Sequence, residues 1–152
     1  MSDPTLKARL AVEITAALRA GEKVRLGALR MLSAAVTNQE KELRHELSDD
    51  EVSDVAAREV KKRAESIEAF QNAGRHELAE KERAEQEAIA AYAPEPMSDA
   101  ELDALLDEAF TTTGATSEDE FGTVMGLVMG KAKGRVDGKV VQEKVRARLS
   151  AS

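Results

Sequence analysis

Apolar residues recur every three or four positions along almost the whole chain, the spacing that places them on one face of an α-helix. This pattern predicts seven helices, at about residues 4–19, 23–45, 48–72, 75–92, 98–113, 117–133 and 138–149. The residues it places on inward faces include Leu18, Ala64, Leu78 and Val140. No run alternates strictly between apolar and polar residues, so no β-strand is expected. The predicted fold is all-α, with a four-helix N-terminal part and a small three-helix C-terminal part.

Three Ser-x-x-Glu sequences mark predicted helix starts, at Ser48–Glu51, Ser98–Glu101 and Ser117–Glu120. In this capping box each side chain accepts a hydrogen bond from the backbone N–H of the other residue, which satisfies donors left free by the first turn. The first helix has a different start signal, because Pro4 suits the first helical position when Asp3 caps the helix.

The clearest interruption of the helical pattern is the pair of prolines at Pro94 and Pro96. Proline fixes its own φ and disfavours the helical conformation of the residue before it, so this segment is expected to be extended. We therefore predict an N-terminal helical domain over residues 1–92, a proline linker over 93–97 and a C-terminal three-helix domain over 98–152.

Composition excludes several function classes. The 152 residues carry a net charge of −7 and contain no cysteine, which excludes disulfides and thiolate metal sites. His76-Glu77 lacks the second histidine of the H-E-x-x-H zinc motif, and no metal or cofactor is expected. The sequence shows no signal peptide, lipidation motif or run of about 20 apolar residues, so we expect a cytoplasmic protein without a membrane segment.

Charge is distributed unevenly within the C-terminal part. Residues 98–120 contain eight acidic residues and no Lys or Arg, whereas residues 121–152 contain two acidic and seven basic residues, a net charge of +5. The last two helices therefore form a basic module in an acidic chain. Such a module is typical of a nucleic-acid contact, but solvated lysines and arginines at helix ends are also common, and both interpretations stay open.

Four glycines follow one another at four-residue spacing, at Gly122, Gly126, Gly130 and Gly134. Gly126 and Gly130 lie inside a predicted helix, where each costs roughly 1 kcal/mol relative to alanine. A chain tolerates this cost where another backbone must come close, because glycine has no Cβ. The sequence leaves open whether that neighbour is another helix or a nucleic-acid backbone.

The connection between the last two predicted helices is short. Gly134 is expected to end the sixth helix and Asp137 to cap the seventh, which predicts a helix-loop-helix with an exposed Arg135 at its corner. The candidate contact residues are Lys131, Lys133, Arg135 and Lys139, together with Gly126, Gly130 and Gly134.

Three segments of the chain resemble the GatB/YqeY family. Phe121-Gly-Thr-Val-Met-Gly and residues 129–141 resemble its closing signature, G-K-V-M-G and K-x-x-G-R-A-D-G before a valine-rich helix. Residues 61–82 resemble K-R-x-x-S-x-x-x-F-x-x-x-G-R-x-D-L-x-x-x-E, and residues 92–98 resemble Y-L-P-x-x-L-S. This chain departs from the usual Asp, Lys and Ala at Glu77, Thr123 and Val136, and Thr123 removes one cation from the candidate surface.

The resemblance implies an accessory protein related to the tail of the B subunit of the tRNA-dependent amidotransferase, a carbon–nitrogen ligase with glutamine as nitrogen donor. In that family the tail is associated with holding the tRNA. The partners it implies are tRNA and a tRNA synthetase or amidotransferase component. No nucleophile motif, P-loop or Rossmann glycine pattern indicates catalysis by this chain, and we assign no catalytic residue. The alternative is a helical protein-interaction adaptor that does not bind RNA.

Overall fold

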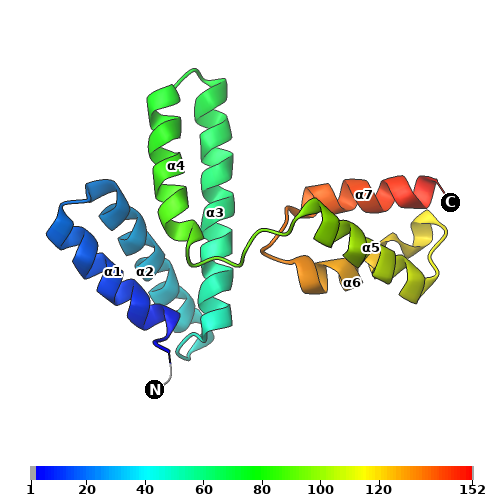
Figure 1. Cartoon of the computed structure of the whole chain (residues 1–152), viewed down its shortest axis with the longest axis horizontal. Coiled ribbons are helices and arrows are strands. Elements are labelled where there is room, and N and C mark those ends of the chain that lie inside the picture. The colour runs from blue at the N-terminus through cyan, green and yellow to red at the C-terminus, as the bar shows by residue number, and fades with distance from the viewer. Residues whose placement is uncertain (1–2, 152) are drawn as a thin grey trace. The chain divides into compact units, whose positions relative to one another are not determined.

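Every regular element of residues 3–151, the part of the chain that this computed structural model describes, is helical (Figure 1). The elements are α1 (Leu6–Ala20), α2 (Lys23–Leu43), α3 (Asp49–Asn72), α4 (His76–Ala90), α5 (Asp99–Thr113), the 3₁₀ turn η1 (Glu118–Glu120), α6 (Phe121–Ala132) and α7 (Gly138–Ser150). The predicted all-α fold, with four N-terminal and three C-terminal helices, is confirmed. None of the described helices is long and apolar enough to cross a membrane.

Contacts between helices group the chain into two compact units, Met1–Pro94 with α1 to α4 and Glu95–Ser152 with α5 to α7. Whether the units are independent domains with boundaries at 1–92, 93–97 and 98–152 stays a prediction. The expected absence of a signal peptide concerns, among others, residues 1 and 2, which like residue 152 lie outside the described part of the chain.

Two of the three predicted capping boxes form. The hydroxyls of Ser48 and Ser98 accept hydrogen bonds from the N–H three residues later, at 3.2 and 3.1 Å, and the glutamates there accept from the serine N–H groups. The third prediction is wrong, because Ser117 makes no side-chain cap and η1 precedes α6. Glu120 instead accepts a hydrogen bond from the N–H of Thr116 at 2.7 Å. This bond replaces the one from the N–H of Ser117 that a capping box requires.

The first helix begins later than its sequence signal predicts. Thr5 is the N-cap of α1, and its hydroxyl accepts a hydrogen bond from the N–H of Ala8 at 3.1 Å. Asp49, at the start of α3, accepts a second one from the N–H of Leu6 at 2.9 Å. A nearer cap and a tertiary contact thus replace the cap predicted at Asp3.

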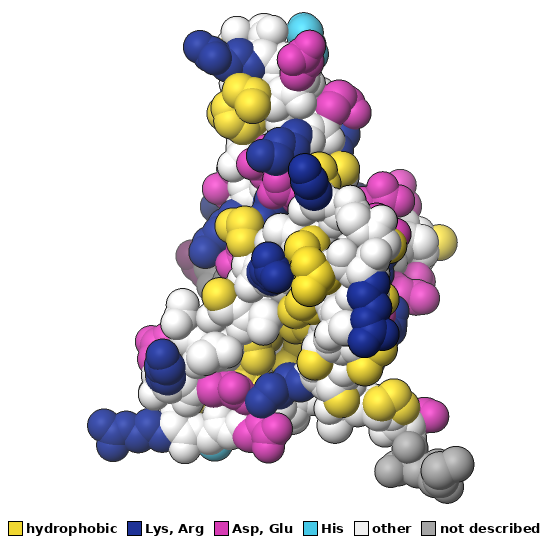
Figure 2. Space-filling view, turned by 90° about the vertical axis from the view of Figure 1, so that its left-hand side faces the viewer, with side chains coloured by type: hydrophobic (Ala, Val, Ile, Leu, Met, Phe, Trp, Pro, Cys, Tyr) yellow, Lys and Arg dark blue, Asp and Glu magenta, His cyan; other side chains and the backbone are white. Residues whose placement is uncertain are grey.

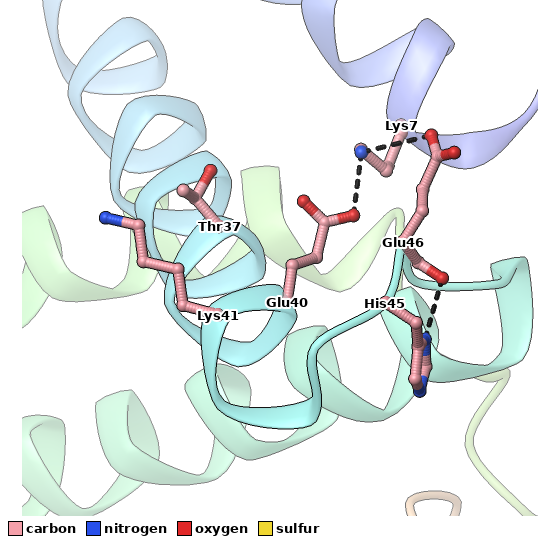
Figure 3. Close-up of a pocket in the computed structure, with 6 residues that line it drawn as sticks. All are labelled: Lys7, Thr37, Glu40, Lys41, His45 and Glu46. Carbon is pink, nitrogen blue, oxygen red and sulfur yellow. Dashed lines mark hydrogen bonds and ion pairs between the residues drawn. The ribbon is translucent and has the colours of Figure 1, made fainter.

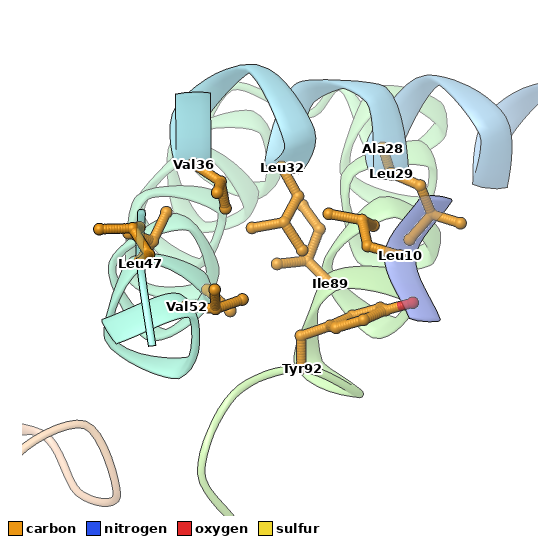
Figure 4. Packing of buried hydrophobic residues seen from close by; sticks show 11 residues of the cluster. Leu10, Ala28, Leu29, Leu32, Val36, Leu47, Val52, Ile89 and Tyr92 are labelled. Carbon is orange, nitrogen blue, oxygen red and sulfur yellow. The ribbon is translucent and has the colours of Figure 1, made fainter. Parts of the chain in front are cut away.

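The core of the N-terminal unit lies where α1, α2, the start of α3 and the end of α4 meet (Figure 4). Leu29 and Leu32 of α2 and Ile89 of α4 are fully buried there. Tyr92 closes the core just beyond the end of α4. Burial raises the pKa of its phenol, and the nearby carboxylate of Glu13 raises that pKa further.

Four residues predicted to face inward lie at the surface instead. Leu18, Leu78 and Val140 are 55%, 40% and 39% exposed, and Ala64 is exposed as well. Helical periodicity does not specify the centre of an apolar stripe to within one residue. In each case an adjacent residue is the buried one: Ala17, Arg63, Ala79 and Val141.

The core of the C-terminal unit takes one face from each of α5, α6 and α7. The contribution of α6 is Val124, Val128 and Ala132, all fully buried at four-residue spacing. The other two helices supply Leu102, Leu106, Ala109, Val141, Val145 and Leu149. Two positions along an α-helix turn by about 200°, so the glycines two residues from each buried valine face away from this core.

Candidate functional site

The outer face of α6 carries Gly122, Gly126 and Gly130, which we call the glycine ridge. Apart from the adjacent residues and the backbone of α6 itself, a Cβ built on any of the three has no atom of the described chain within 4 Å. Thr123 and Leu127, which is 43% exposed, flank the ridge on the same side of the helix. The sequence leaves open whether another helix or a nucleic-acid backbone approaches these glycines. No helix of the described chain packs against them, so the ridge is open to an external molecule.

The end of α6 turns sharply through Lys133 and Gly134. Lys133 has φ −55° and ψ 129°, Gly134 has φ 78°, and the N–H of Arg135 donates to the carbonyl of Ala132 at 2.9 Å. This is a type II turn, which requires a positive φ at its third residue and so favours glycine there. Asp137 then caps α7 as predicted, accepting a hydrogen bond from the Lys139 N–H at 2.9 Å.

The cations around this turn differ in their surroundings. Lys133 and Lys139 are exposed, and neither makes an ion pair with any other residue of the described chain. We call these two residues the lysine corner. Lys131 pairs with Glu108 of α5 at 3.1 Å, although it remains well exposed.

Arg135 is anchored rather than free at the corner, which corrects the expectation that it is exposed. Its Nε donates to the carbonyl of Glu95 at 2.9 Å, and its guanidinium pairs with Glu101 at 2.9 Å. Its own carbonyl accepts a hydrogen bond from the N–H of Met97 at 2.7 Å. The Arg135 guanidinium, together with the backbone N–H of Ser98, lowers the pKa of Glu101. Arg135 therefore ties the chain before α5 to the α6–α7 turn.

The acidic stretch before residue 121 lies against the basic one after it. Lys144 pairs with Asp103 at 3.1 Å and Arg148 with Asp107 at 2.5 Å, so with Lys131 and Arg135 four of the seven cations contact carboxylates of α5. A fifth, Arg146, lies over the ring of Phe121. Residues 95–152 together contain eleven acidic and seven basic residues, a net charge of −4. The cations without a carboxylate partner in the described part of the unit are therefore Arg146 and the two residues of the lysine corner.

Sequence reasoning missed a buried charge cluster in the N-terminal unit. Arg63 of α3 is 5% exposed and donates to Glu82, at 3.1 Å, and to Glu85 of α4. Its other terminal nitrogen lies 3.2 Å from the sulfur of Met31 on α2. Arg63 and Glu82 both occupy defined positions of the family-like motif in residues 61–82, near its start and at its end. Their presence in one motif is the sequence signal that could have indicated this contact.

A second charged cluster joins α1 to the loop after α2 (Figure 3). Lys7 donates to Glu40 at 2.7 Å and to Glu46 at 3.2 Å, and Glu40 also accepts the N–H of Leu47 at 2.9 Å. The hydrogen bond between them raises the pKa of Lys7 and lowers the pKa of Glu40. Lys7 and Glu40, the two residues of this cluster with a shifted pKa, are paired with each other. We therefore interpret the cluster as a structural contact between α1 and the end of α2.

Nowhere within residues 3–151 do three or more His, Asp or Glu side chains come together in a group that could hold a metal ion. His45 lies beside the Lys7 cluster, where its Nδ1 contacts the carbonyl of Glu46 at 2.9 Å.

Comparison with known proteins identifies the family. The profile of the Yqey-like protein family matches residues 7–149. A fungal protein from Pyrenophora tritici-repentis, named altered inheritance of mitochondria protein 41, mitochondrial, is 30% identical over 103 residues. That match covers 66% of this chain and 57% of the relative, so the chain aligns with less than two thirds of the relative's length. The family match extends from α1 to α7, and this chain belongs to the Yqey-like protein family.

Proposed function

We propose that this protein is an accessory module that binds tRNA through the glycine ridge and the lysine corner. The observation that carries the proposal is their proximity along the chain: three glycines on α6 with open space beside them, and, at the turn after α6, two exposed lysines that make no ion pair with the described chain. The likeness to the tail of the amidotransferase B subunit supports tRNA as the nucleic acid. A cytoplasmic location belongs to the same proposal.

Binding would depend on phosphates and on shape. Lysines contact phosphates as point charges, and glycines let a sugar–phosphate backbone approach the helix without a side chain between them. Phe121, the aromatic residue that begins α6, is covered by Arg146, whose guanidinium lies 4.6 Å from the ring centre. The surface therefore offers no aromatic platform for base stacking among its described residues, and recognition of RNA by shape fits it better than sequence readout.

The lysine corner can be tested by charge removal. Lys133→Ala/Lys139→Ala should weaken binding of bulk tRNA by roughly tenfold and reduce the log–log salt slope by about two, because two phosphate contacts are lost. Electrophoretic shift or fluorescence anisotropy at two salt concentrations measures both. Arg58→Ala/Lys61→Ala is the matched control, since it removes two exposed cations of α3 and leaves the corner intact. Equal binding by the test and control variants would contradict the proposal.

The glycine ridge can be tested without destabilising the protein. Gly126→Ala/Gly130→Ala adds two methyl groups into open space on a helix, so it should weaken tRNA binding while raising stability by about 1–2 kcal/mol. Thr15→Ala, an exposed change to a better helix former on α1, is a control that should leave tRNA binding unchanged. If the ridge variant binds tRNA as tightly as the unchanged protein, the RNA backbone does not approach α6.

A protein-interaction adaptor is the second candidate function. It is favoured by one observation: α5 neutralises four of the seven cations, which leaves a largely apolar ridge with Leu127 exposed beside it. On this account a partner helix would pack on the ridge. The ridge variant would then lose a protein partner that survives nuclease treatment, while tRNA binding would be absent throughout.

The amidotransferase label of the related family is not proposed as an activity of this chain. Glutamine-dependent transfer belongs, by the resemblance, to parts of the amidotransferase outside the tail. Incubation of the purified protein with glutamine and a charged tRNA tests this assignment directly, and any glutamine-dependent product would contradict it.

A further inference from the structure

Met31 of α2 differs in exposure from the other methionines of the described chain. It is 53% exposed and lines a hollow between α2 and α4, whereas Met97, Met125 and Met129 are partly buried against the core of the C-terminal unit. One helical turn before it, Gly27 leaves the surface of α2 without a side chain. Figure 2 looks onto the side of the N-terminal unit that carries α1, α2 and α4, where apolar side chains lie uncovered among charged ones. Small molecules in solution can therefore reach the Met31 side chain.

The sulfur of Met31 lies against a buried guanidinium. Its Sδ is 3.2 Å from Nη2 of Arg63, a residue of α3 that is 5% exposed. A thioether sulfur is a weak acceptor, so it satisfies this N–H group poorly. Sulfur also has two lone pairs, and a contact with one N–H group leaves the other lone pair free to react.

Arg63 has more donors than strong acceptors around it. Its Nη1 donates to Glu82 at 3.1 Å and to Glu85. Its Nε is buried and has no hydrogen-bond partner within residues 3–151. In a planar guanidinium the Nε–H and one N–H of Nη2 point in nearly the same direction. The edge of Arg63 that contacts the Met31 sulfur is therefore the edge that lacks a strong acceptor.

The acceptor that fits this edge is a neutral one. Arg63 shares its charge between Glu82 and Glu85, and Lys81 lies 4.0 Å from Glu85, so two cations face two carboxylates. A further anion would add an uncompensated negative charge beside these carboxylates. A neutral oxygen would instead complete the hydrogen bonding of the guanidinium and leave the charge balance unchanged.

We propose that Met31 is a site of oxidation to methionine sulfoxide and that Arg63 binds the new oxygen. The oxidant is hydrogen peroxide. A lone pair of the sulfur attacks one peroxide oxygen, the O–O bond breaks, and the departing hydroxide takes the proton of the transferred oxygen to form water. The sulfur loses two electrons and the peroxide gains them.

The product matches the unsatisfied edge of Arg63. Oxidation turns an apolar thioether into a polar group with a strong acceptor oxygen, which in an apolar core disrupts packing. At Met31 the oxygen instead replaces the sulfur as the partner of Nη2, on the same edge as the free Nε–H. Oxidation therefore strengthens the contact between α2 and α3. This inference goes beyond the proposed function and does not depend on tRNA binding.

Limited treatment of the full-length protein with hydrogen peroxide tests the site. In tryptic peptides analysed by tandem mass spectrometry, Met31 should gain one oxygen at least about fivefold faster than Met97, Met125 or Met129, because oxidation follows exposure. Rates at Met31 equal to or lower than those at the other three overturn the proposal.

Thermal unfolding of the protein oxidised once, at Met31, tests the bound oxygen. Oxidation should raise the unfolding midpoint by about 2–4 °C, because the oxygen accepts from a charged donor more strongly than the sulfur does. Met31→Leu/Leu18→Met is the matched control, since it moves the methionine to a position of α1 that is 55% exposed in the unchanged protein. Oxidation of this control should not raise the midpoint. No rise in the unchanged protein, or an equal rise in the control, overturns the proposal.

Two fixed side chains test the same contact without an oxidant. Met31→Gln supplies a neutral amide oxygen beside Arg63, and Met31→Leu supplies no acceptor. Met31→Gln should unfold at the higher temperature, although leucine is the slightly better helix former. At the exposed Leu18 the order should be reversed, with Leu18→Gln unfolding below the unchanged protein. If Met31→Gln is no more stable than Met31→Leu, Arg63 does not bind a neutral oxygen at this position and the proposal is overturned.

Discussion

Arg63 is a charged side chain that α3 buries against α4, where Glu82 and Glu85 accept its hydrogen bonds. Taking a guanidinium out of water costs several kcal/mol unless carboxylates and hydrogen bonds compensate for the lost hydration. The compensating groups here come from the neighbouring helix. The cluster therefore favours one register of the α3–α4 hairpin and holds Met31 beside it.

Removing Arg63 should be strongly destabilising. Arg63→Ala leaves Glu85 buried without its guanidinium, so the free energy of unfolding should fall by about 3 kcal/mol. Urea denaturation followed by circular dichroism measures the change. Arg58→Ala, on an exposed position of the same helix, should change the stability by less than about 0.5 kcal/mol. A loss for Arg63→Ala as small as that of the control would show that the cluster is not compensating a buried charge.

The Lys7 cluster makes stability depend on pH at the acidic end. The folded-state pKa of Glu40 lies below its ordinary value of 4.5, so its stabilising contribution is present above that value and is lost as the pH falls through the folded pKa. Glu40→Gln should therefore be less stable than the unchanged protein at pH 7, and the difference in stability should narrow as the pH falls through the folded-state pKa of Glu40. Urea midpoints at a series of pH values measure the gap, with Glu42→Gln on the same helix as control. A gap that persists at acid pH would contradict the linkage.

Single buried positions were the hardest features to predict. The apolar pattern of α3 fits Ala64 inside as well as it fits Arg63, because the two differ by one step around the helix. The choice depends on Glu82 and Glu85, about twenty residues later, reaching the same point. The sequence predicts an exposed Arg135 because it does not show that Glu95 and Glu101, both distant in sequence, bind its side chain.

At the scale of the elements, α6 uses glycine in two physically different ways. Gly126 and Gly130 are ordinary helical residues with open space beside them, whereas Gly134 has a φ of 78° in the type II turn. Only the second conformation is strained for residues that carry a Cβ. The turn thus depends on Gly134, and the helix itself does not depend on the other two.

Alanine substitution should therefore have opposite effects at the two places. Gly134→Ala should lower the free energy of unfolding by about 1–2 kcal/mol, because an L-residue is strained at positive φ. Gly126→Ala should raise it by up to about 1 kcal/mol. Thermal unfolding of the full-length variants gives both signs. If both substitutions shift the melting temperature in the same direction, the glycines do not differ in the way described.

Helices were the most predictable level, because their signals are local. Periodicity and the boxes at Ser48 and Ser98 identify α3 and α5 from residues a few positions apart. The failures occurred where another group competed for the same donor or acceptor. Thr5 and Asp49 replace the predicted Asp3 cap of α1, and the backbone of Thr116 takes the carboxylate of Glu120.

At the scale of the whole molecule, ion pairs between helices determine which of the cations remain available to a ligand. The sequence predicts the positions of the glycines and of the turn. It does not predict that carboxylates of α5 pair with four of the seven cations of the basic module. Such pairing depends on how helices pack, which the sequence does not specify. It also separates the lysine corner from the remaining cations.

Neutralising α5 should consequently strengthen tRNA binding. Asp103→Asn/Asp107→Asn removes the carboxylates that pair with Lys144 and Arg148, so the positive charge of α7 is less compensated. Surface ion pairs contribute about 0–1 kcal/mol each, so the protein should remain folded. Glu118→Gln/Asp119→Asn gives the same change in net charge on η1. A gain in affinity that is equal for both variants would show that only net charge matters, and no gain for the α5 variant would contradict the electrostatic account.

The central claim, that α6 and the turn after it form a contact surface for tRNA, is tested most directly by nuclear magnetic resonance. Titrating tRNA into the ¹⁵N-labelled protein follows the amide signals of every glycine separately. The account predicts shifts or broadening at Gly122, Gly126 and Gly130 and at residues 133–139, with the amides of α1 to α4 unchanged. Perturbations confined to the N-terminal unit, or none at tRNA concentrations that bind in the shift assay, would contradict it.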